Sequence, residues 1–141
     1  MFTRRILAMN AMYKLPINGT PTVLSDAEIR LPAFRRTLMD EINEINEITD
    51  GIATGDVRDA DMLVMLADLL GDIVVYCHSE AMKYGIPLEA VLDIIMDSNE
   101  SKLGADGQPI YNADGKFLKG PNYWKPEPKI KALLDLYGAR A

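Results

Sequence analysis

One long apolar segment constrains the fold of this chain more than any other part of its sequence. Residues 59–85 open with acidic side chains and close at a glycine, and almost every residue from Leu63 to Tyr76 is apolar. The apolar residues recur at helical spacing, and a helix that is apolar nearly all round is buried on most of its sides. This segment therefore predicts a helical bundle with a core shared between subunits.

The rest of the chain also favours helices, so an all-α bundle of about four to five helices is predicted. Pro32 suits a first helical turn, the SDAE stretch at residues 25–28 has the form of a capping box, and Gly51 is placed to end a helix. The four helices that such signals delimit cover residues 32–50, 59–85, 87–103 and 128–137.

Residues 104–127 differ in character and are predicted to form a long ordered loop. They contain two Asp-Gly pairs and several prolines, which are turn signals. Four aromatic residues in the same stretch argue against disorder. A small hairpin is expected to turn at Asp114 and Gly115.

Composition limits the classes of function. The 141 residues suffice for one domain over residues 1–141 with a core of its own. The net charge is −6 and no Lys/Arg cluster occurs, so no nucleic acid polymer is expected as a partner. No apolar run reaches the roughly 18 residues of a membrane span, and no cleavage site follows the short apolar stretch of residues 1–13, so neither membrane nor signal peptide is expected. The single cysteine, Cys77, fits a reduced, cytoplasmic setting.

Two pairs of acidic residues are candidates for a metal site. Glu41 and Glu44 lie three apart in the stretch DEINEINEI, and Asp68 and Asp72 lie four apart in the apolar helix. Each pair shares one helix face, and two helices joined by a short connection can pack antiparallel, which lets the pairs face each other. Buried unpaired carboxylates are costly, and no Lys or Arg lies within residues 59–82. A hard divalent cation such as Mg²⁺ would compensate these charges.

Other interpretations of the same residues stay open. The aspartates could pair with Arg35 or Arg36, and the glutamates could form a solvated surface. A di-iron bundle would need Glu-x-x-His motifs, but the only histidine, His78, has Val75 three positions before it. In a non-catalytic helical binding module, the acids would form a surface for a partner.

The order of the two acidic pairs resembles that of the all-α nucleoside triphosphate pyrophosphohydrolases. This superfamily includes the MazG-like proteins, the dimeric dUTPases and the phosphoribosyl-ATP pyrophosphohydrolase-like group. Its pattern is Glu-x-x-Glu, a spacer, and then Glu-x-x-Asp. Glu41 and Glu44 match the first half of the pattern, and Asp72 matches the final aspartate.

The sequence departs from that pattern at one position. Leu69 stands three residues before Asp72, where the superfamily has an acid. Asp68 is the nearest replacement, because a residue four positions away still faces the same side of a helix, and Glu47 is the alternative. The metal ligands that the resemblance implies are Glu41, Glu44, Asp68 and Asp72.

A second segment strengthens the resemblance. SNESK at residues 98–102, followed by a glycine-rich tail that includes KGPNY, resembles the Ser-Asn-x-Ser-Lys segment of the phosphoribosyl-ATP pyrophosphohydrolase-like group. It implies substrate-binding roles for Asn99 and Lys102. Without the resemblance, Asn99 would be taken for a helix cap and Lys102 for a surface residue. The long loop could also cover the base, which makes Lys119 and Tyr123 candidates for contacts to phosphate and base; alternatively, its aromatic side chains anchor the loop to the bundle or to a second subunit.

The resemblance also implies an activity. Such enzymes cleave a nucleoside triphosphate between the α- and β-phosphates and release pyrophosphate, here in clean-up of the nucleotide pool. Mg²⁺, with Mn²⁺ as the second candidate ion, would neutralise the phosphates, and Glu41 or Glu44 would act as the general base. The expected partners are the nucleotide and further copies of the chain, in a homodimer or homotetramer.

Overall fold

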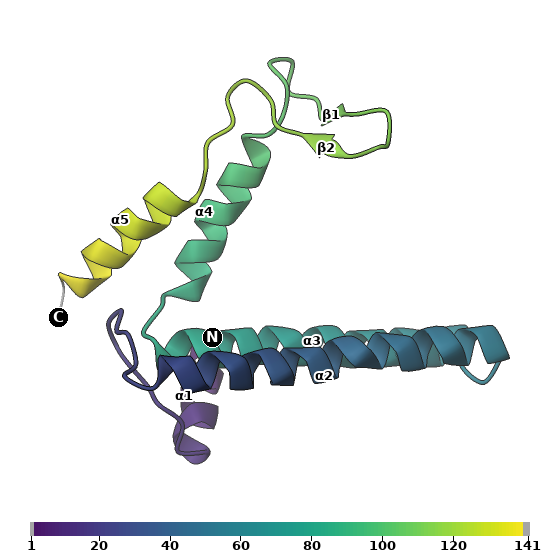
Figure 1. Ribbon diagram of the computed structural model, residues 1–141, viewed down its shortest axis with the longest axis horizontal. Helices are drawn as coiled ribbons and strands as arrows, with labels where there is room; N and C mark the ends of the chain where they lie inside the picture. Colours follow the sequence, from purple (N-terminus) through teal and green to yellow (C-terminus); the bar gives the residue numbers. More distant parts are fainter. Residues whose placement is uncertain (1, 140–141) are drawn as a thin grey trace. The chain divides into compact units, whose positions relative to one another are not determined.

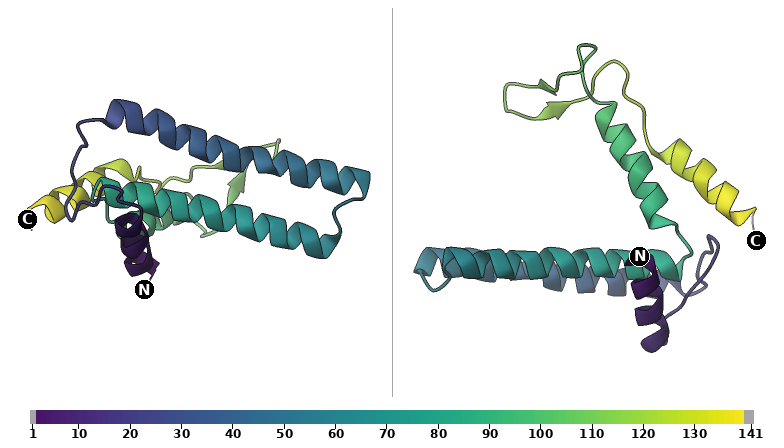
Figure 2. Two further views of the ribbon diagram at one scale, coloured as in Figure 1. Left: turned by 90° about the horizontal axis from the view of Figure 1, so that it is seen from below. Right: turned by 180° about the vertical axis from the view of Figure 1, so that it is seen from behind.

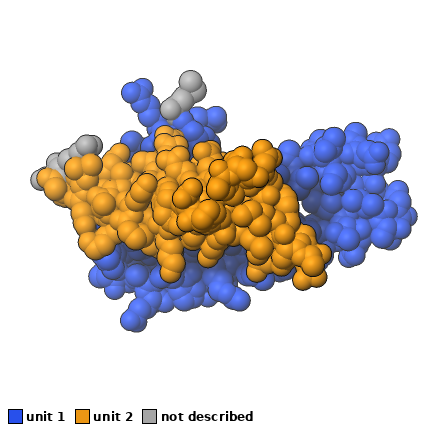
Figure 3. Space-filling model, turned by 90° about the horizontal axis from the view of Figure 1, so that it is seen from above, with its two compact units in different colours: residues 1–85 blue, residues 86–141 orange. Residues whose placement is uncertain are grey.

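The computed structural model describes residues 2–139. The chain divides into two compact units, Met1–Gly85 and Ile86–Ala141, which Figure 3 shows in blue and orange. The described residues form five α-helices and one two-stranded hairpin, which confirms the predicted all-α class. None of these helices is long and apolar enough to span a membrane. The single domain over residues 1–141 stays a prediction.

Unit 1 is built on a long helical hairpin. α2 (Ala27–Thr54) and α3 (Asp59–Lys83) run antiparallel and side by side, joined by residues 55–58 (Figures 1 and 2). A third helix, α1 (Phe2–Met12), packs against α3. The two helices that carry the acidic pairs are therefore neighbours, as predicted.

α2 is longer than predicted, and Gly51 does not end it. The helix contains Pro32 and runs on to Gly55, whose φ of +78° is a conformation that favours glycine. A Cβ atom at Gly51 would overlap the Val57 side chain, and the Val57 amide donates to the Gly51 carbonyl at 3.0 Å. Gly51 thus has a packing role, because its missing side chain lets the connection fold back over the helix end.

The predicted capping box at residues 25–28 is wrong. The N-cap residue of α2 is Asp26, and its side chain forms no capping hydrogen bond. Its Oδ1 instead accepts a hydrogen bond from the Nε of Arg30 at 2.7 Å. The Asp26 carboxylate therefore forms an ion pair with Arg30, one helical turn away, and does not cap the helix.

α3 begins at residue 59, as predicted, and ends at Lys83, two residues before the predicted end, but it is not buried on most of its sides. Leu69 is only 1% exposed, and it is one of the most deeply buried large side chains among the described residues. Four apolar residues on other faces of the helix have about half or more of their surface exposed: Leu63, Val64, Leu70 and Val74. The core shared between subunits stays a prediction.

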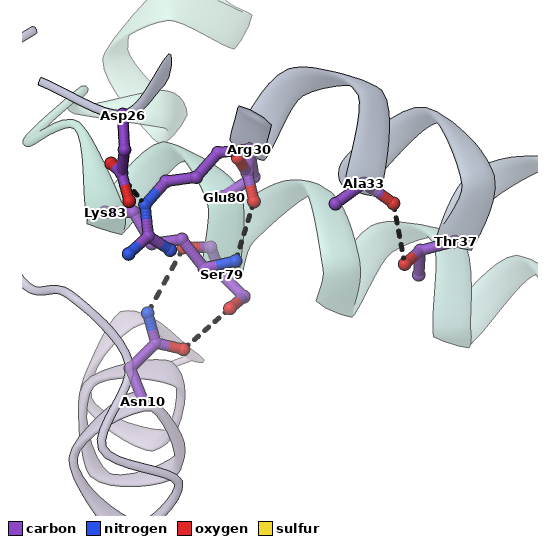
Figure 4. A network of polar contacts seen from close by, with 8 residues as sticks. All are labelled: Asn10, Asp26, Arg30, Ala33, Thr37, Ser79, Glu80 and Lys83. Carbon is purple, nitrogen blue, oxygen red and sulfur yellow. Dashed lines mark hydrogen bonds and ion pairs between the residues drawn. The ribbon is translucent and has the colours of Figure 1, made fainter. Parts of the chain in front are cut away.

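α1 was not predicted, because one of its innermost residues is polar. Ile6 and Asn10 are the buried residues of this helix, and Asn10 has no exposed surface. The Asn10 Oδ1 accepts a hydrogen bond from the Ser79 hydroxyl at 2.7 Å, and its Nδ2 donates to the Ser79 carbonyl at 3.2 Å (Figure 4). Both polar ends of the asparagine are therefore bound to one residue of α3.

Unit 2 confirms the predicted hairpin and both C-terminal helices. Its elements are α4 (Leu88–Glu100), β1 (Ile110–Tyr111), β2 (Phe117–Leu118) and α5 (Glu127–Gly138). The strands pair antiparallel, with Ile110 opposite Leu118, and α4 packs against α5. The hairpin turns through Gly115, whose φ is +75°, and the Asn112 side chain accepts backbone hydrogen bonds across the turn.

Candidate functional site

The centre of the candidate site is Glu41, a buried carboxylate on α2. Its residue surface is 8% exposed, and its Oε2 atom is buried without a hydrogen-bond partner among residues 2–139. A buried polar atom without a partner is rare, because its desolvation is not compensated. Sequence reasoning placed Glu41 among the metal ligands, and its environment distinguishes it from an acid on a solvated helix face.

The other predicted acids act on Glu41 electrostatically. Burial raises the pKa of Glu41 above its ordinary value, and the negative charges of Glu44, Asp72 and, more weakly, Asp68 raise it further. A hydrogen bond with Tyr76 opposes this rise in the pKa. All four predicted acids therefore belong to one electrostatic site between α2 and α3.

The acids differ in exposure. Glu44 and Asp72 are half-buried, whereas Asp68 is exposed. Glu47, the alternative fourth ligand, is also exposed. Leu69, which stands three positions before Asp72, is almost completely buried, so a carboxylate in its place would carry a desolvation penalty.

The donor set fits Mg²⁺ in its chemistry. Carboxylate oxygens are the ligands that this ion prefers, and the Oε2 of Glu41 is an acceptor that no protein group satisfies. Among residues 2–139, however, no three acids, histidines or cysteines already converge into a group that could hold a metal ion. The facing helices supply the right ligands, but the side chains are not gathered around one point.

Tyr76 is a site residue that sequence reasoning missed. Burial raises the pKa of its hydroxyl, and the nearby charges of Glu41 and Asp72 raise it further, so the hydroxyl stays protonated and can donate to Glu41. The signal was present in the sequence, because Tyr76 lies one helical turn after Asp72 and therefore on the same face.

A cavity of about 510 Å³ adjoins the acids inside unit 1. Its walls come from α1, α2, α3 and the segment after α1, and both Asp72 and Tyr76 line it. Arg30, Glu80 and Lys83 also line it, and Figure 4 shows these three side chains close together. The cavity thus joins the acidic site to a second group of charged residues.

Glu80 is the unusual member of that group. It is 8% exposed, and its Oε2 accepts a hydrogen bond from the Nζ of Lys83 at 2.8 Å. Its Oε1 is buried and has no hydrogen-bond partner in the described part of the chain. Sequence reasoning missed Glu80, Arg30 and Lys83, because nothing in their spacing along the chain indicates a shared cavity.

The predicted substrate-binding residues all lie in unit 2. The Lys102 Nζ donates to the Asn99 Oδ1 at 2.7 Å, and the Lys119 ammonium lies 4.8 Å from the centre of the Tyr123 ring. The Gly120 amide donates to the Lys102 carbonyl at 2.7 Å. The SNESK segment and the tail therefore form one local structure.

Two serines of the SNESK segment hold that tail in place. The Ser98 hydroxyl donates to the Trp124 carbonyl at 2.9 Å, and the Trp124 amide donates to the Ser101 hydroxyl at 3.2 Å. A Cβ atom at Gly120 would overlap the Leu103 carbonyl, so only glycine permits this close approach. The segment that carries the second resemblance thus has a structural role within unit 2.

The histidine and the cysteine of the chain, His78 and Cys77, do not lie in environments that would activate them for catalysis. The His78 ring meets the Phe2 ring edge to face, with 4.9 Å between the ring centres. Burial raises the pKa of the Cys77 thiol, which disfavours the nucleophilic thiolate. Neither environment is that of a nucleophile.

Comparison with known proteins supports the fold. No protein-family model and no curated protein matches the chain. Among solved structures, the crystal structure of a protein from Exiguobacterium sp. 255-15, described as a "putative NTP pyrophosphohydrolase", matches with a TM-score of 0.55. The match covers 99% of this chain and 98% of that one, at 19% sequence identity. The chain therefore shares its all-α fold with this protein.

Proposed function

We propose that the protein is a Mg²⁺-dependent nucleoside triphosphate pyrophosphohydrolase that cleaves between the α- and β-phosphates. The observation that carries the proposal is the buried Glu41 carboxylate, whose Oε2 is unpartnered while three further acids act on it. A carboxylate site that concentrates negative charge without a protein cation suits a divalent ion and the phosphates that such an ion binds. The fold shared with the Exiguobacterium protein agrees with this assignment.

Glu41 is the best candidate for the general base. Its carboxylate is buried at the centre of the acidic site, where it could accept a proton from the attacking water. The hydrogen bond with Tyr76 would hold the carboxylate in one orientation. Glu44, Asp68 and Asp72 would hold Mg²⁺ together with Glu41. The bound ion would neutralise charge on the phosphate oxygens.

We also propose that Lys102 and Lys119 bind phosphate, with Asn99 and Tyr123 beside them. Within residues 2–139, neither lysine is among the residues that form ion pairs with an acid. Their neighbours are an amide oxygen and an aromatic ring, which leave the positive charge uncompensated. An anionic substrate would supply that compensation.

A homodimer or homotetramer is part of the proposal. The exposed apolar side chains of α3 would lose contact with water in such an assembly, which favours association. Light scattering coupled to size-exclusion chromatography measures the mass in solution. A monomer at all concentrations would contradict this part alone.

The decisive experiment measures pyrophosphate release from ribo- and deoxyribonucleoside triphosphates, with and without Mg²⁺. We expect release that requires the metal and that Glu44→Gln abolishes. Glu28→Gln is the matched control, because Glu28 is an exposed acid on the same helix. Comparing Asp68→Asn with Glu47→Gln would identify the fourth ligand, since only the true ligand should lower the apparent Mg²⁺ affinity.

A negative result would have a clear meaning. If no nucleotide releases pyrophosphate and Mg²⁺ does not raise the melting temperature, the acids are not a catalytic metal site. The non-catalytic binding module with an acidic partner surface would then be the better assignment.

A further inference from the structure

The cavity beside the acids is large enough for the base of the proposed nucleotide. Its volume of about 510 Å³ lies in the range of small-molecule sites. It begins at Asp72 and Tyr76, which belong to the acidic site, and continues along α3 to Glu80 and Lys83. Glu80 lies eight residues beyond Asp72, or about 12 Å along the helix axis. A nucleoside whose phosphates rest at the acids would extend over such a distance.

The walls of the cavity combine flat rings with charged groups. Tyr13 and Phe34 line it and offer faces against which a planar base can stack. Arg30 uses its Nε on Asp26, so its two terminal nitrogens are available as donors. Aromatic surface with a few convergent polar groups is the usual composition of a small-molecule site.

Glu80 supplies the feature that points to a ligand. Its side chain is nine-tenths buried, it lines the cavity, and its Oε1 lacks a hydrogen-bond partner. Lys83 occupies only the other oxygen. The free oxygen is a buried acceptor, and a ligand that donates an N–H to it would remove an energetic penalty.

We propose that this cavity binds the nucleobase and that Glu80 selects bases carrying a ring N–H next to a carbonyl. Guanine, uracil and thymine present this edge, with the N–H donating to Glu80 and the carbonyl accepting from Arg30 or Lys83. Adenine and cytosine carry an unprotonated ring nitrogen at that position, whose lone pair would face the carboxylate. The inference rests on the proposed function, since it assumes that the ligand is a nucleotide.

The Glu80→Gln substitution makes this selection testable. The Lys83 ammonium can only donate, so it would hold the amide oxygen of the new side chain. The amide NH₂ would then face the base where the free carboxylate oxygen had been. Because the amide donates where the carboxylate accepted, it can pair with the unprotonated ring nitrogen of adenine or cytosine. The preference for guanine and uracil over adenine and cytosine should therefore be reversed.

The experiment titrates the protein with GMP, UMP, AMP and CMP by calorimetry in the presence of Mg²⁺, which would offset the repulsion between the acids and the nucleotide phosphate. We expect GMP and UMP to bind more tightly than AMP and CMP. In Glu80→Gln the affinity for GMP and UMP should fall about 10- to 100-fold, the usual loss for one charge-assisted hydrogen bond, while AMP and CMP gain relative to them. Glu28→Gln should bind like the wild type.

A second variant tests the location independently of Glu80. Ala33 lines the cavity on α2, and Ala33→Leu would fill part of the space with a good helix former. We expect it to weaken binding of all four mononucleotides while the melting temperature stays close to that of the wild type. Equal binding of the four bases by the wild type, an equal loss for all of them in Glu80→Gln, or unchanged binding in Ala33→Leu would each overturn the proposal.

The two proposals fail in different ways. The titrations contain no triphosphate, so they do not depend on catalysis. Base-selective binding without pyrophosphate release from any triphosphate would contradict the proposed reaction and leave the base pocket in place. Metal-dependent pyrophosphate release that is indifferent to the base and to Glu80→Gln would support the reaction and overturn the pocket.

Discussion

Ser79→Ala should measure how strongly α1 is fixed to α3. The substitution removes the hydroxyl that donates to Asn10 Oδ1 at 2.7 Å, and it leaves the second bond, to the Ser79 carbonyl, in place. Asn10 has no exposed surface, so water cannot replace the lost donor without a change in structure. The free energy of unfolding should therefore fall by about 1–3 kcal/mol, the cost of a buried polar atom left without a partner.

The same loss can be expressed as a melting temperature. At about 2.1 cal/mol/K per residue, a chain of 141 residues has an unfolding entropy of about 0.3 kcal/mol/K. A destabilisation of about 1–3 kcal/mol then lowers the melting temperature by about 3–10 °C. Far-UV circular dichroism during heating and in a urea series would measure both quantities.

The control is Ser25→Ala, a change of the same kind at an exposed position, which should alter stability by less than about 0.5 kcal/mol. A double-mutant cycle adds Asn10→Ala and Asn10→Ala/Ser79→Ala. Because the two side chains share one hydrogen bond, the double variant should lose less than the sum of the single variants. Additive losses, or a Ser79→Ala loss no larger than that of the control, would refute the argument.

Three further predictions concern the acids and unit 2. Since burial and neighbouring acids raise the pKa of Glu41 in the folded protein above 4.5, the folded state binds more protons than the unfolded state above that pH. The stability of the metal-free protein should therefore fall as the pH rises from 4.5 through the raised pKa, and urea midpoints over a pH series should show a smaller fall in Glu41→Gln. Leu69→Glu would restore the acid of the superfamily pattern, but it would bury a charge where Leu69 is 1% exposed. We therefore expect the free energy of unfolding, measured in thermal melts, to fall by several kcal/mol. A stable variant with higher Mg²⁺ affinity would contradict our account of this position. Gly120→Ala should destabilise the tail by about 1–3 kcal/mol, because the added Cβ would overlap the Leu103 carbonyl. The loss would appear as faster hydrogen exchange at the amides of residues 120 and 124. The control is Gly138→Ala, where the added Cβ meets no atom, and it should leave that exchange unchanged.

Much of the helical structure could be predicted because its signals are local. The bounds of α3 follow from its acidic start and from Gly85, and the hairpin follows from the Asp-Gly pair at residues 114–115. Gly51 was misinterpreted because its role depends on Val57, a contact made only after the chain has turned. α1 was missed because its deepest residue, Asn10, is polar and breaks the apolar pattern.

The candidate site could likewise be predicted only in part. The acids could be predicted, because carboxylates inside an apolar helix stand out in any sequence and their spacing puts each pair on one face. The cavity could not, because Arg30 and Glu80 lie 50 positions apart and meet only through the register of two packed helices. The unpartnered oxygens of Glu41 and Glu80 are likewise properties of packing and not of composition.

The helical hairpin also has a consequence for the order of folding. Because α2 and α3 are joined by residues 55–58, contacts near the connection close shorter loops than contacts far from it. Glu44 and Asp68 are 24 positions apart, whereas Arg30 and Lys83 are 53 apart, a difference of about 0.7 kcal/mol in closure entropy. The hairpin should therefore form first near the connection and last at its far end. The negatively charged acids of the two helices would then come together before the far end has formed. Repulsion between these acids would then act on the folding barrier, so the refolding rate should rise with ionic strength.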